Sequence, residues 1–546
     1  MKRETSRDYA RPYRPRAIAW AHRVGEATGA APRLWPLEVP ALLQAARRRT
    51  GLEIFGDEGF VPALERLVAA MRDEAQLTPT GLAIQRARLV EALCTRLRLE
   101  ALERAHPELE TLPLPPVVVI AGVQRTGTTK LQRLLSADPD ARALRSWEAL
   151  DPVPRPGEAR GQGQRRRRRA RLAQGALAYL APDFFAVHPV EADAPEEDVL
   201  LLDLAFMSQT PEATLHVPSY ARWLETQDYA PAYALLRRLL RVLTWQQPGR
   251  RWVLKTPEHL EHLDALLGAF PAATVVWTHR DPLETMASFC SMVAHGRGVF
   301  SDHVDPHEVG RHWLRKVRRM GLRALDVRMR HPERFVDVAY EELVKDPLGQ
   351  IERIYAVLGE PLSARARAAM LALDARNVQH RHGVHRYALE DFGLTRDDVD
   401  RELGFLRGIA EGRVDAATRA AARAVGSEGV RRGSAEAVSS GSAAGVDGAV
   451  KASGVGHADA LQRRLHPLAP LAGGQVAISQ RQFDVLIHRE IAEQVEALKD
   501  EPDVAVTHQR PLARRQIRHR GVLEEVAAAS RRVEQAEDRK QRRLAG

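Results

Sequence analysis

The sequence predicts an α/β fold with three layers, in which helices cover both faces of a central parallel sheet. The segment PVVVIAG, which begins at Pro116, is an uninterrupted β-branched run of the kind that is buried on both faces of such a sheet. Three later segments with strand character are each followed by a helical stretch: Arg251–Leu254, Thr274–Thr278 and Phe335–Val338. Strands that alternate with helices are typical of a parallel sheet between two helical layers.

Two further regions flank this sheet domain, which we place at residues 113–410. Residues 1–112 form a helical N-terminal region, because apolar residues recur there at three- and four-residue spacing, as in Leu64, Leu67, Val68 and Met71. Residues 411–546 form a low-complexity tail that we expect to be disordered or partly helical. Of the 12 Phe, 8 Trp and 9 Tyr residues, only Phe483 lies in this tail. A flexible Arg-rich appendage and translation from an altered reading frame would both produce such a composition.

Size and composition exclude several classes of protein. With 546 residues and 44% apolar content, the chain is not wholly disordered. Its two cysteines, Cys94 and Cys290, cannot form a disulfide framework or a four-thiolate zinc site, which favours a reducing compartment. No segment has the roughly 20 consecutive apolar residues that span a bilayer, and the start lacks a signal peptide. We therefore expect a cytoplasmic protein with no membrane partner.

The formal net charge of +10 suits a nucleic acid, an anionic surface or a polyanionic small molecule. The five consecutive arginines Arg165–Arg169 follow the breaker-rich stretch Pro152–Gly163 and have no interleaved aromatic residues for base stacking. We expect this run to be a solvated loop or helix start, and we expect no nucleic-acid partner.

The most informative segment is the turn after the first strand, AGVQRTGTTKLQRLL. Gly122 and Gly127 have the G-x-x-x-x-G spacing of a phosphate loop, in which backbone N–H groups approach an anion at a helix N-terminus. Thr128 stands where a Walker A loop has lysine, and Thr129 stands in its Ser/Thr position. The anion cradle therefore remains without the lysine that binds a nucleoside triphosphate, and Arg125 supplies a cation. A P-loop kinase-like phosphotransferase explains the glycine spacing only.

Between Val117 and Leu394 the sequence resembles the sulfotransferases that use 3′-phosphoadenosine 5′-phosphosulfate (PAPS), particularly bacterial members related to tyrosylprotein sulfotransferases. The family's loop around the 5′-phosphosulfate matches Arg125, Thr126, Gly127, Thr128 and Thr129. In the stretch THRDPLETMASFCSM, Arg280 and Ser288 match the pair that holds the 3′-phosphate. The resemblance implies a P-loop NTPase-like fold and in-line transfer of the sulfonate group from PAPS to a hydroxyl or amine acceptor. It implies no metal.

The resemblance also suggests roles for residues outside the donor-binding motifs. Glu148, shortly after the first helix, is the expected base, and Lys255 matches the lysine of the family's Lys-Asp-Pro motif, although Thr256 replaces the aspartate. Together with Arg125, Lys255 would neutralise charge on the transferred group. Tyr340 is a candidate nucleotide contact. The segment that contains His380, His382, His385, Arg386 and Tyr387 resembles a stretch that can close over the donor, with Arg386 and Tyr387 as its candidates.

Two features are not explained by the donor motifs. His259 and His262 lie three residues apart, but the sequence offers no third convergent ligand, so we expect both on a helix surface rather than on a metal. The aromatic-rich segment from Phe184 to Trp245 lies between the two donor-binding motifs and is the natural place for an acceptor pocket and lid. Its aromatic content favours an apolar or aromatic acceptor, although helix packing would use the same residues.

Overall fold

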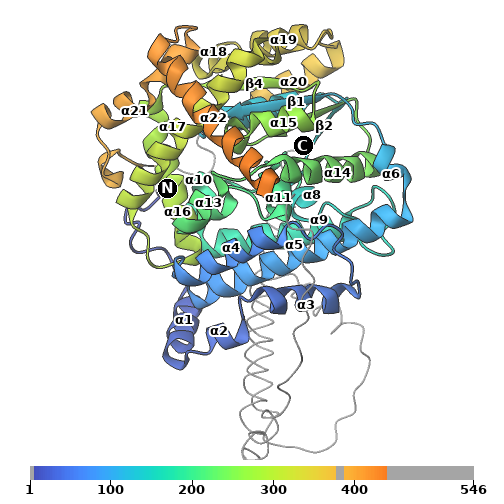
Figure 1. The fold of residues 1–546 in the computed structure, drawn as a ribbon, viewed down its shortest axis with the longest axis vertical. Coiled ribbons are helices and arrows are strands. Elements are labelled where there is room, and N and C mark those ends of the chain that lie inside the picture. The colour runs from blue at the N-terminus through green and yellow to red at the C-terminus, as the bar shows by residue number, and fades with distance from the viewer. Residues whose placement is uncertain (1–4, 377–385, 440–546) are drawn as a thin grey trace, which may run out of the picture. The chain divides into compact units, whose positions relative to one another are not determined.

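The computed structural model describes residues 5–376 and 386–439, and its centre is a five-stranded parallel sheet (Figure 1). The strand order is β2-β3-β1-β4-β5. The strands are β1 (Val117–Gly122), β2 (Ala141–Ala143), β3 (Arg251–Lys255), β4 (Thr274–His279) and β5 (Phe335–Ala339). The four predicted strands are confirmed. The short strand β2 was not predicted, because its Ala-Arg-Ala sequence carries no strand pattern.

The register of the sheet brings the ends of three strands together. The central strand β1 pairs with β3 and β4, so that Ile120 lies opposite Lys255 and Gly122 lies opposite Thr278. Because all strands are parallel, their carboxyl ends lie at the same edge of the sheet. The loop after Gly122, the side chain of Lys255 and the turn after β4 therefore meet at this edge.

Helices cover both faces of the sheet, as the sequence predicts (Figure 1). One face packs against helices whose apolar residues share a core with Val118 and Ile120: α7 (Thr128–Leu135), α18 (Tyr340–Lys345), α19 (Pro347–Val357) and α20 (Ala364–Arg376). The opposite face, with Val119 and Trp252, packs against a larger set: α14 (Ala230–Gln246), α15 (Leu263–Ala269), α16 (Pro282–Phe300), α17 (Pro306–Arg330) and α21 (Arg396–Ala410).

The N-terminal region is helical and continuous with the core of the sheet domain. Its helices are α1 (Arg16–Thr28), α2 (Ala31–Leu34), α3 (Val39–Thr50), α4 (Val61–Asp73), α5 (Pro79–Ala105) and α6 (Glu108–Thr111). Leu64, Leu67, Val68 and Met71 of α4 are buried in the same core cluster as Val119 of β1. Helices α3, α4, α5 and α6 therefore share one hydrophobic core with the sheet, whereas Ala31 of α2 packs in a small separate cluster.

A long helical segment connects β2 and β3. It contains α8 (Ser146–Leu150), α9 (Gln164–Leu180), α10 (Pro182–Val187), α11 (Val199–Leu202), α12 (Thr210–Thr214) and α13 (Pro218–Leu224), followed by α14. The arginine run begins α9, where Arg165 and Arg168 are exposed, as expected. The expectation is wrong for Arg166, which is 1% exposed, because it forms an ion pair with Glu158 and lies over the Trp147 ring.

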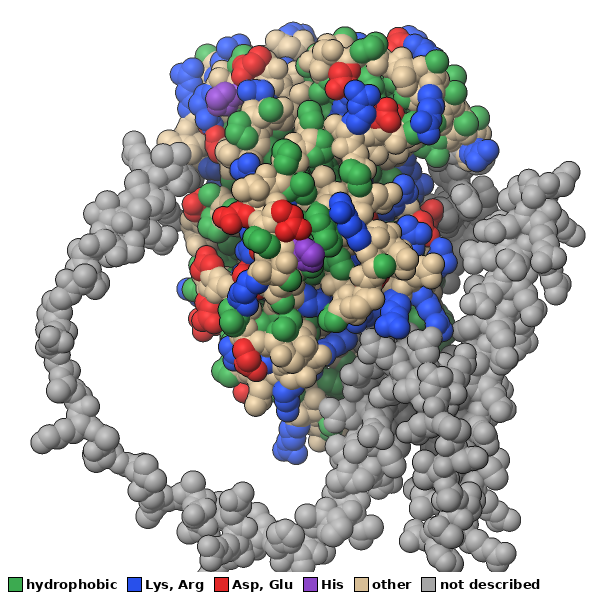
Figure 2. All heavy atoms as spheres, turned by 90° about the vertical axis from the view of Figure 1, so that its right-hand side faces the viewer, with side chains coloured by type: hydrophobic (Ala, Val, Ile, Leu, Met, Phe, Trp, Pro, Cys, Tyr) green, Lys and Arg blue, Asp and Glu red, His purple; other side chains and the backbone are tan. Residues whose placement is uncertain are grey.

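Charged side chains of both signs occupy the surface. On the face drawn in Figure 2, Lys and Arg side chains are interspersed with Asp and Glu side chains. Such a mixture differs from the continuous basic stripe that is typical of a nucleic-acid interface. In the part of the chain that the structure describes, no helix combines the length and apolar character needed to cross a membrane.

The packed region extends beyond the boundary at residue 410. Helix α22 (Ala416–Ser439) lies against α17, and Ala422 is fully buried in the main core. Arg323 of α17 donates a hydrogen bond to the carbonyl oxygen of Val425 (3.3 Å). The first part of the chain after residue 410 therefore packs on the core, which the loss of aromatic residues did not predict.

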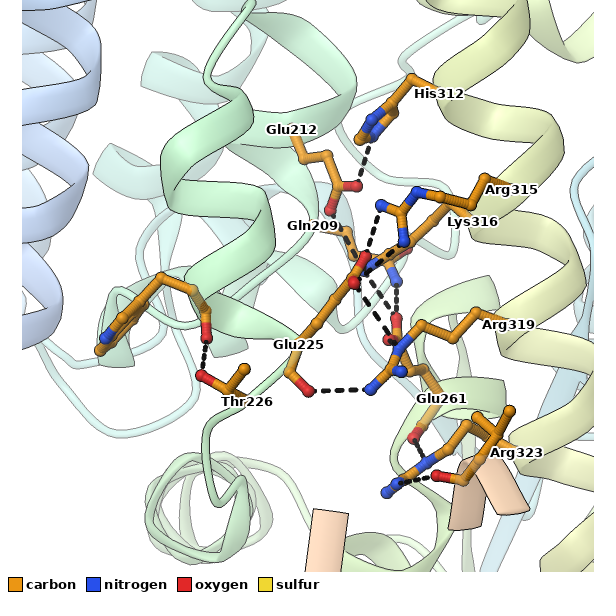
Figure 3. A network of polar contacts seen from close by, with 12 residues as sticks. Gln209, Glu212, Glu225, Thr226, Glu261, His312, Arg315, Lys316, Arg319 and Arg323 are labelled. Atoms are coloured by element: carbon orange, nitrogen blue, oxygen red, sulfur yellow. Dashed lines mark hydrogen bonds and ion pairs between the residues drawn. The ribbon is translucent and has the colours of Figure 1, made fainter. Parts of the chain in front are cut away.

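A buried network of charges ties α17 to the segment between β2 and β3 (Figure 3). Lys316 of α17 is almost fully buried and lies 2.8 Å from Glu261 and 3.5 Å from Glu212 and Glu225. Arg319 pairs with Glu261 at 2.6 Å. Burial alone would raise the pKa of Glu261, but the charges of Lys316, His262 and Arg319 outweigh burial and hold that pKa below its ordinary value. The network stays charged in the interior.

Candidate active site

The loop between β1 and α7 has the backbone shape of an anion cradle. Gly127 has a φ of +88°, and a Cβ on it would lie 2.9 Å from the Tyr340 ring. Arg125 also adopts a positive φ of 73°. Thr126 anchors the loop, because its hydroxyl donates to the carbonyl oxygen of Val123 (2.6 Å) and lies 2.7 Å from the hydroxyl of Thr278 on β4. Helix α7 begins at Thr128, so its first N–H groups have no partner within the helix and can bind an anion.

The second predicted motif lies directly beside this loop. Asp281 caps α16 by accepting a hydrogen bond from the N–H of Leu283 (2.9 Å), which places Ser288 in the second turn of the helix. The Nε of Arg125 donates to the hydroxyl of Ser288 at 3.1 Å. Arg280 donates to the carbonyl oxygen of Arg125 at 3.3 Å. The structure therefore brings Arg125, Arg280 and Ser288 into one site.

Tyr340 joins the two motifs. It begins α18, its ring faces Gly127, and the Arg280 guanidinium lies 4.1 Å from the centre of that ring. Burial lowers the pKa of Arg125, and the neighbouring charge of Arg280 lowers it further, against the influence of the Tyr387 and Tyr340 hydroxyls. Within residues 5–376 and 386–439, no carboxylate forms an ion pair with Arg125. The guanidinium groups of Arg125 and Arg280 are neighbours, and that of Arg125 has no carboxylate partner among the described residues. Such a pair suits an anionic ligand.

Lys255 lies at the end of β3 at the same edge of the sheet. Its side chain is 3% exposed, and its Nζ lies 2.6 Å from Oε1 of Glu197. The main-chain N–H of Lys255 donates to Oδ1 of Asp198 at 2.8 Å. Thr256, which replaces the expected aspartate, accepts a hydrogen bond from the N–H of Glu258 (3.4 Å) at the start of the next short helix. Lys255 therefore stands beside a carboxylate that sequence reasoning missed.

Glu148 has a different environment from the one we expected. Its carboxylate receives two hydrogen bonds from the Arg142 guanidinium, at 2.5 and 3.0 Å, and a third from the N–H of Arg145 at 3.0 Å. The side chain is 2% exposed. Both oxygens are thus engaged in a buried ion pair that closes the first turn of α8. The structure gives Glu148 a structural environment and does not support it as the base.

The expectation for His259 and His262 is wrong, because both are buried. Nδ1 of His259 forms a hydrogen bond with the hydroxyl of Tyr233 (2.8 Å), and its Nε2 lies 2.8 Å from Oδ2 of Asp198. His262 stacks on the Tyr229 ring at 3.4 Å between centroids. Among the residues that the structure describes, no group of three or more His, Cys, Asp or Glu side chains is arranged to hold a metal ion.

The aromatic residues between Phe184 and Trp245 mostly serve packing. Tyr220, Tyr229 and Tyr233 are buried in the main core. Burial raises the pKa of all three phenols. These three tyrosines therefore serve packing, whereas Phe184 of α10 lines an open hollow, and the acceptor pocket stays a prediction.

Two hollows lie along helix α16, and the second contains residues of the site. One, of about 380 Å³, lies between the N-terminal segment, α10 and α16, with a lining that includes Tyr9, Tyr13, Phe184, Ala294 and His295. The hydroxyls of Tyr9 and Ser291, the latter one turn after Ser288, lie 2.8 Å apart. The other hollow, of about 360 Å³, lies at the end of β4, with a lining that includes Thr126, Thr278, Arg280, Met286 and Leu406.

The segment expected to close over the donor is described only from Arg386 onward. Both Arg386 and Tyr387 are exposed, and the Tyr387 hydroxyl lies near enough to Arg125 to influence its pKa. His380, His382 and His385 lie outside the described residues.

The fold and the site define an α/β protein whose first strand is followed by a phosphate-binding type of loop, in which Thr128 replaces the lysine of the Walker A motif. Comparisons with known proteins agree with this class. Residues 116–364 match the family model described as "Sulfotransferase family". The crystal structure of sulfotransferase STF1 from Mycobacterium tuberculosis H37Rv is 34% identical, with a TM-score of 0.60, over 67% of this chain and 98% of that chain. Sulfotransferase STF9 from Mycobacterium avium is 29% identical, with a TM-score of 0.58, over 67% and 95%. The chain belongs to the sulfotransferase family.

Curated relatives include the omega-hydroxy-beta-dihydromenaquinone-9 sulfotransferase Stf3 of Mycobacterium bovis and of Mycobacterium tuberculosis. Each is 26% identical to this chain over 274 residues, which is 46% of this chain. The match spans 64% of the length of these relatives.

Proposed function

We propose that this protein transfers the sulfonate group of PAPS to a hydroxyl group of an acceptor. The contact between Arg125 and Ser288 is the observation that supports this proposal most strongly, because it unites the two predicted anion sites. A donor with a phosphosulfate at one end and a 3′-phosphate at the other needs two adjacent anion sites at one sheet edge.

In this proposal the loop residues Arg125–Thr129 and the N-terminus of α7 hold the phosphosulfate, and Arg280 and Ser288 hold the 3′-phosphate. The Tyr340 ring supports both sites, because it contacts Gly127 and Arg280. Arg125 and Lys255 supply the positive charge that stabilises the transferred sulfonate and the leaving phosphate. The donor-binding part of this scheme uses cationic side chains and helix N–H groups in place of a metal.

The residue types at the loop favour sulfonate transfer over phosphate transfer. Thr128 occupies the position of the lysine that contacts the β- and γ-phosphates in P-loop kinases. No observation on the structure favours the kinase-like alternative, and we do not retain it.

For the acceptor we propose a hydroxyl group on a largely apolar molecule. Two curated relatives are named for a hydroxylated menaquinone derivative, which is an apolar molecule of this kind. The hollow beside α16, with the rings of Tyr9, Tyr13 and Phe184 in its lining, offers apolar surface next to the helix that carries Ser288.

Transfer of radioactive sulfonate tests the proposal. The purified chain is incubated with [³⁵S]PAPS and either farnesol, an isoprenoid alcohol, or 4-nitrophenol, and products are separated in the presence of EDTA. We expect a sulfated product or, with water as the acceptor, release of sulfate. Phosphorylation of either probe from Mg²⁺–ATP, with no consumption of PAPS, would contradict the proposal.

A further inference from the structure

We infer that Glu197, paired with Lys255, accepts the proton of the acceptor's hydroxyl group. This inference rests on the proposed function and replaces the base that the sequence suggested. Four steps support it: the place of Glu197 at the sheet edge, the way its loop is held, the engagement of the neighbouring carboxylates, and the charge balance of the reaction.

In space, Glu197 lies between the end of β3 and helix α7, the helix that follows the anion-binding loop. Its Oε1 lies 2.6 Å from Nζ of Lys255, the residue that stands opposite Ile120 of β1. The carbonyl oxygen of the preceding residue, Glu196, accepts a hydrogen bond from Gln132 of α7 (2.9 Å). Gln132 lies in the second turn of the helix whose N-terminus forms the anion cradle. Glu197 is therefore placed beside the proposed phosphosulfate site.

A buried chain of polar contacts holds the backbone next to Glu197. Oδ1 of Asp198 accepts from the N–H of Lys255, and Oδ2 of Asp198 lies 2.8 Å from His259. His259 in turn contacts the hydroxyl of Tyr233 (2.8 Å). The side chains of Asp198 and His259 are fully buried, and so is Tyr233. We assign Asp198, His259 and Tyr233 as positioning residues, which explains why the histidine is buried.

Two other carboxylates near the site, those of Glu148 and Glu196, are already engaged. Both oxygens of Glu148 bind Arg142. For Glu196, one oxygen accepts from the Ser146 hydroxyl (2.9 Å) and the other accepts from the N–H of Glu197 (3.0 Å). Oε2 of Glu197 has only a long contact of 3.5 Å with the Thr256 hydroxyl, and 23% of the Glu197 side chain is exposed. Of these three carboxylates, Glu197 is thus the one that can accept a proton from a bound hydroxyl.

The proposed step balances in atoms and charge. The acceptor oxygen forms a bond to sulfur, its proton passes to Oε2 of Glu197, and the bond between sulfur and the bridging oxygen breaks. The electron pair of that bond stays on the 5′-phosphate of adenosine 3′,5′-bisphosphate. As Glu197 becomes neutral, the ammonium of Lys255 loses its ion-pair partner and is available to the new negative charge on the phosphate.

Glu197→Gln tests the inference, with Glu196→Gln as the matched control on the adjacent residue. The measurements are calorimetric binding of adenosine 3′,5′-bisphosphate, the melting temperature, and [³⁵S]PAPS turnover with farnesol and with 4-nitrophenol. Turnover with water as the acceptor is followed in the same samples, so that the variants can be compared even if neither probe is accepted. Glu197→Asp serves as a second variant in case the glutamine variant does not fold.

We expect Glu197→Gln to bind the bisphosphate as wild type does and to lose about 100-fold or more in turnover with farnesol. The loss should be smaller with 4-nitrophenol, because that phenol is partly ionised at neutral pH and needs a base less. The fall in wild-type kcat/KM toward acidic pH should disappear in Glu197→Gln, which a merely structural residue would not cause. Glu196→Gln should retain turnover within about 3-fold.

Three results would overturn the inference: full turnover in Glu197→Gln, an equal loss in Glu196→Gln, or a parallel loss of bisphosphate binding in Glu197→Gln alone. A wild-type chain that neither binds the bisphosphate nor consumes PAPS would instead refute the proposed function, and the inference with it.

Discussion

Arg125 donates a hydrogen bond to the Ser288 hydroxyl, and the two residues come from different strand-to-helix turns of the sheet. Arg125 follows the central strand β1, and Ser288 belongs to the helix after the neighbouring strand β4. The contact makes one continuous site out of a loop that can hold one anion and an Arg–Ser pair that can hold another. Tyr340, which directly follows the edge strand β5, lies against both parts, because its ring faces Gly127 of the loop and the Arg280 guanidinium.

Replacement of Arg280 by alanine should weaken binding of adenosine 3′,5′-bisphosphate more than it affects folding. The guanidinium is partly exposed and would lose a charge-assisted contact with phosphate, which corresponds to roughly 1.5–3 kcal/mol, or about 10- to 150-fold in affinity. Calorimetry measures this change. Arg250→Ala, which removes a highly exposed arginine elsewhere, is the control and should bind as wild type. Unchanged affinity in a folded Arg280→Ala would remove Arg280 from the site.

Glu148→Gln should destabilise the protein and retain bisphosphate affinity. The substitution leaves the buried Arg142 without its negative partner, and disruption of a buried ion pair costs about 3–5 kcal/mol. Urea unfolding measures the free energy of unfolding. If stability is unchanged while turnover is lost, Glu148 is the base after all and Glu197 is not.

Lys316→Met should also destabilise the protein, because Glu212, Glu225 and Glu261 would lose their shared buried cation. We expect a loss of about 3 kcal/mol or more. Bisphosphate binding by the folded fraction should be normal, since no residue of this network belongs to the proposed site. A variant as stable as wild type would show that the apolar side chain fills the space without penalty.

Acidic pH should remove the stabilisation that the Glu308 carboxylate provides to the folded state. Burial raises the pKa of Glu308, but the hydrogen bond from His216 and the charge of Arg297 outweigh burial and bring it to about 2. Because the folded-state pKa lies below the unfolded one, the stabilisation by this carboxylate is complete above about pH 5 and is lost as the pH falls toward 2. The difference in unfolding free energy between wild type and Glu308→Gln should therefore shrink over this range. A difference that does not vary between pH 6 and pH 3 would contradict the assignment.

A chain that ends after Gly412 should be less stable than one that ends after Ser439. The shorter chain lacks α22, including the buried Ala422 and the carbonyl that binds Arg323. We expect a melting temperature lower by several degrees, equivalent to about 1 kcal/mol or more. Ala422→Asp in the full chain places a charge in the same buried position and should lower the melting temperature in the same direction. Equal stability of the two truncated chains would show that α22 contributes no packing energy.

Local sequence patterns predicted the central sheet, and the resemblance to the sulfotransferases suggested the residues that bind the donor. Strand β1 is a continuous apolar run, and β3, β4 and β5 contain shorter apolar stretches, each followed by a helical segment. Parallel register then brings the residues after β1, β3 and β4 to one edge. The family motifs suggested Arg125, Arg280 and Ser288, and the structure brings these three residues together, while their binding of the donor stays a prediction. Strand β2 could not be predicted in this way, because its three residues are too few to show an apolar run or an alternation of apolar and polar residues.

The remaining features depend on contacts between distant residues. Spacing placed Glu148 near the loop but could not show that Arg142 turns toward its carboxylate. Glu197 was missed because its partner Lys255 lies in a separate part of the sequence, joined to it only by the packing of the connecting segment on β3. His259 and His262 likewise could not be distinguished from surface residues, since the tyrosines that bury them come from α14 and the turn before it.

Calorimetric titration with adenosine 3′,5′-bisphosphate in EDTA tests the central claim most directly. We expect saturable binding at one site without divalent metal, weakened in Arg280→Ala and unchanged in Arg250→Ala. Absence of binding in EDTA, together with binding of ATP that requires Mg²⁺, would contradict it.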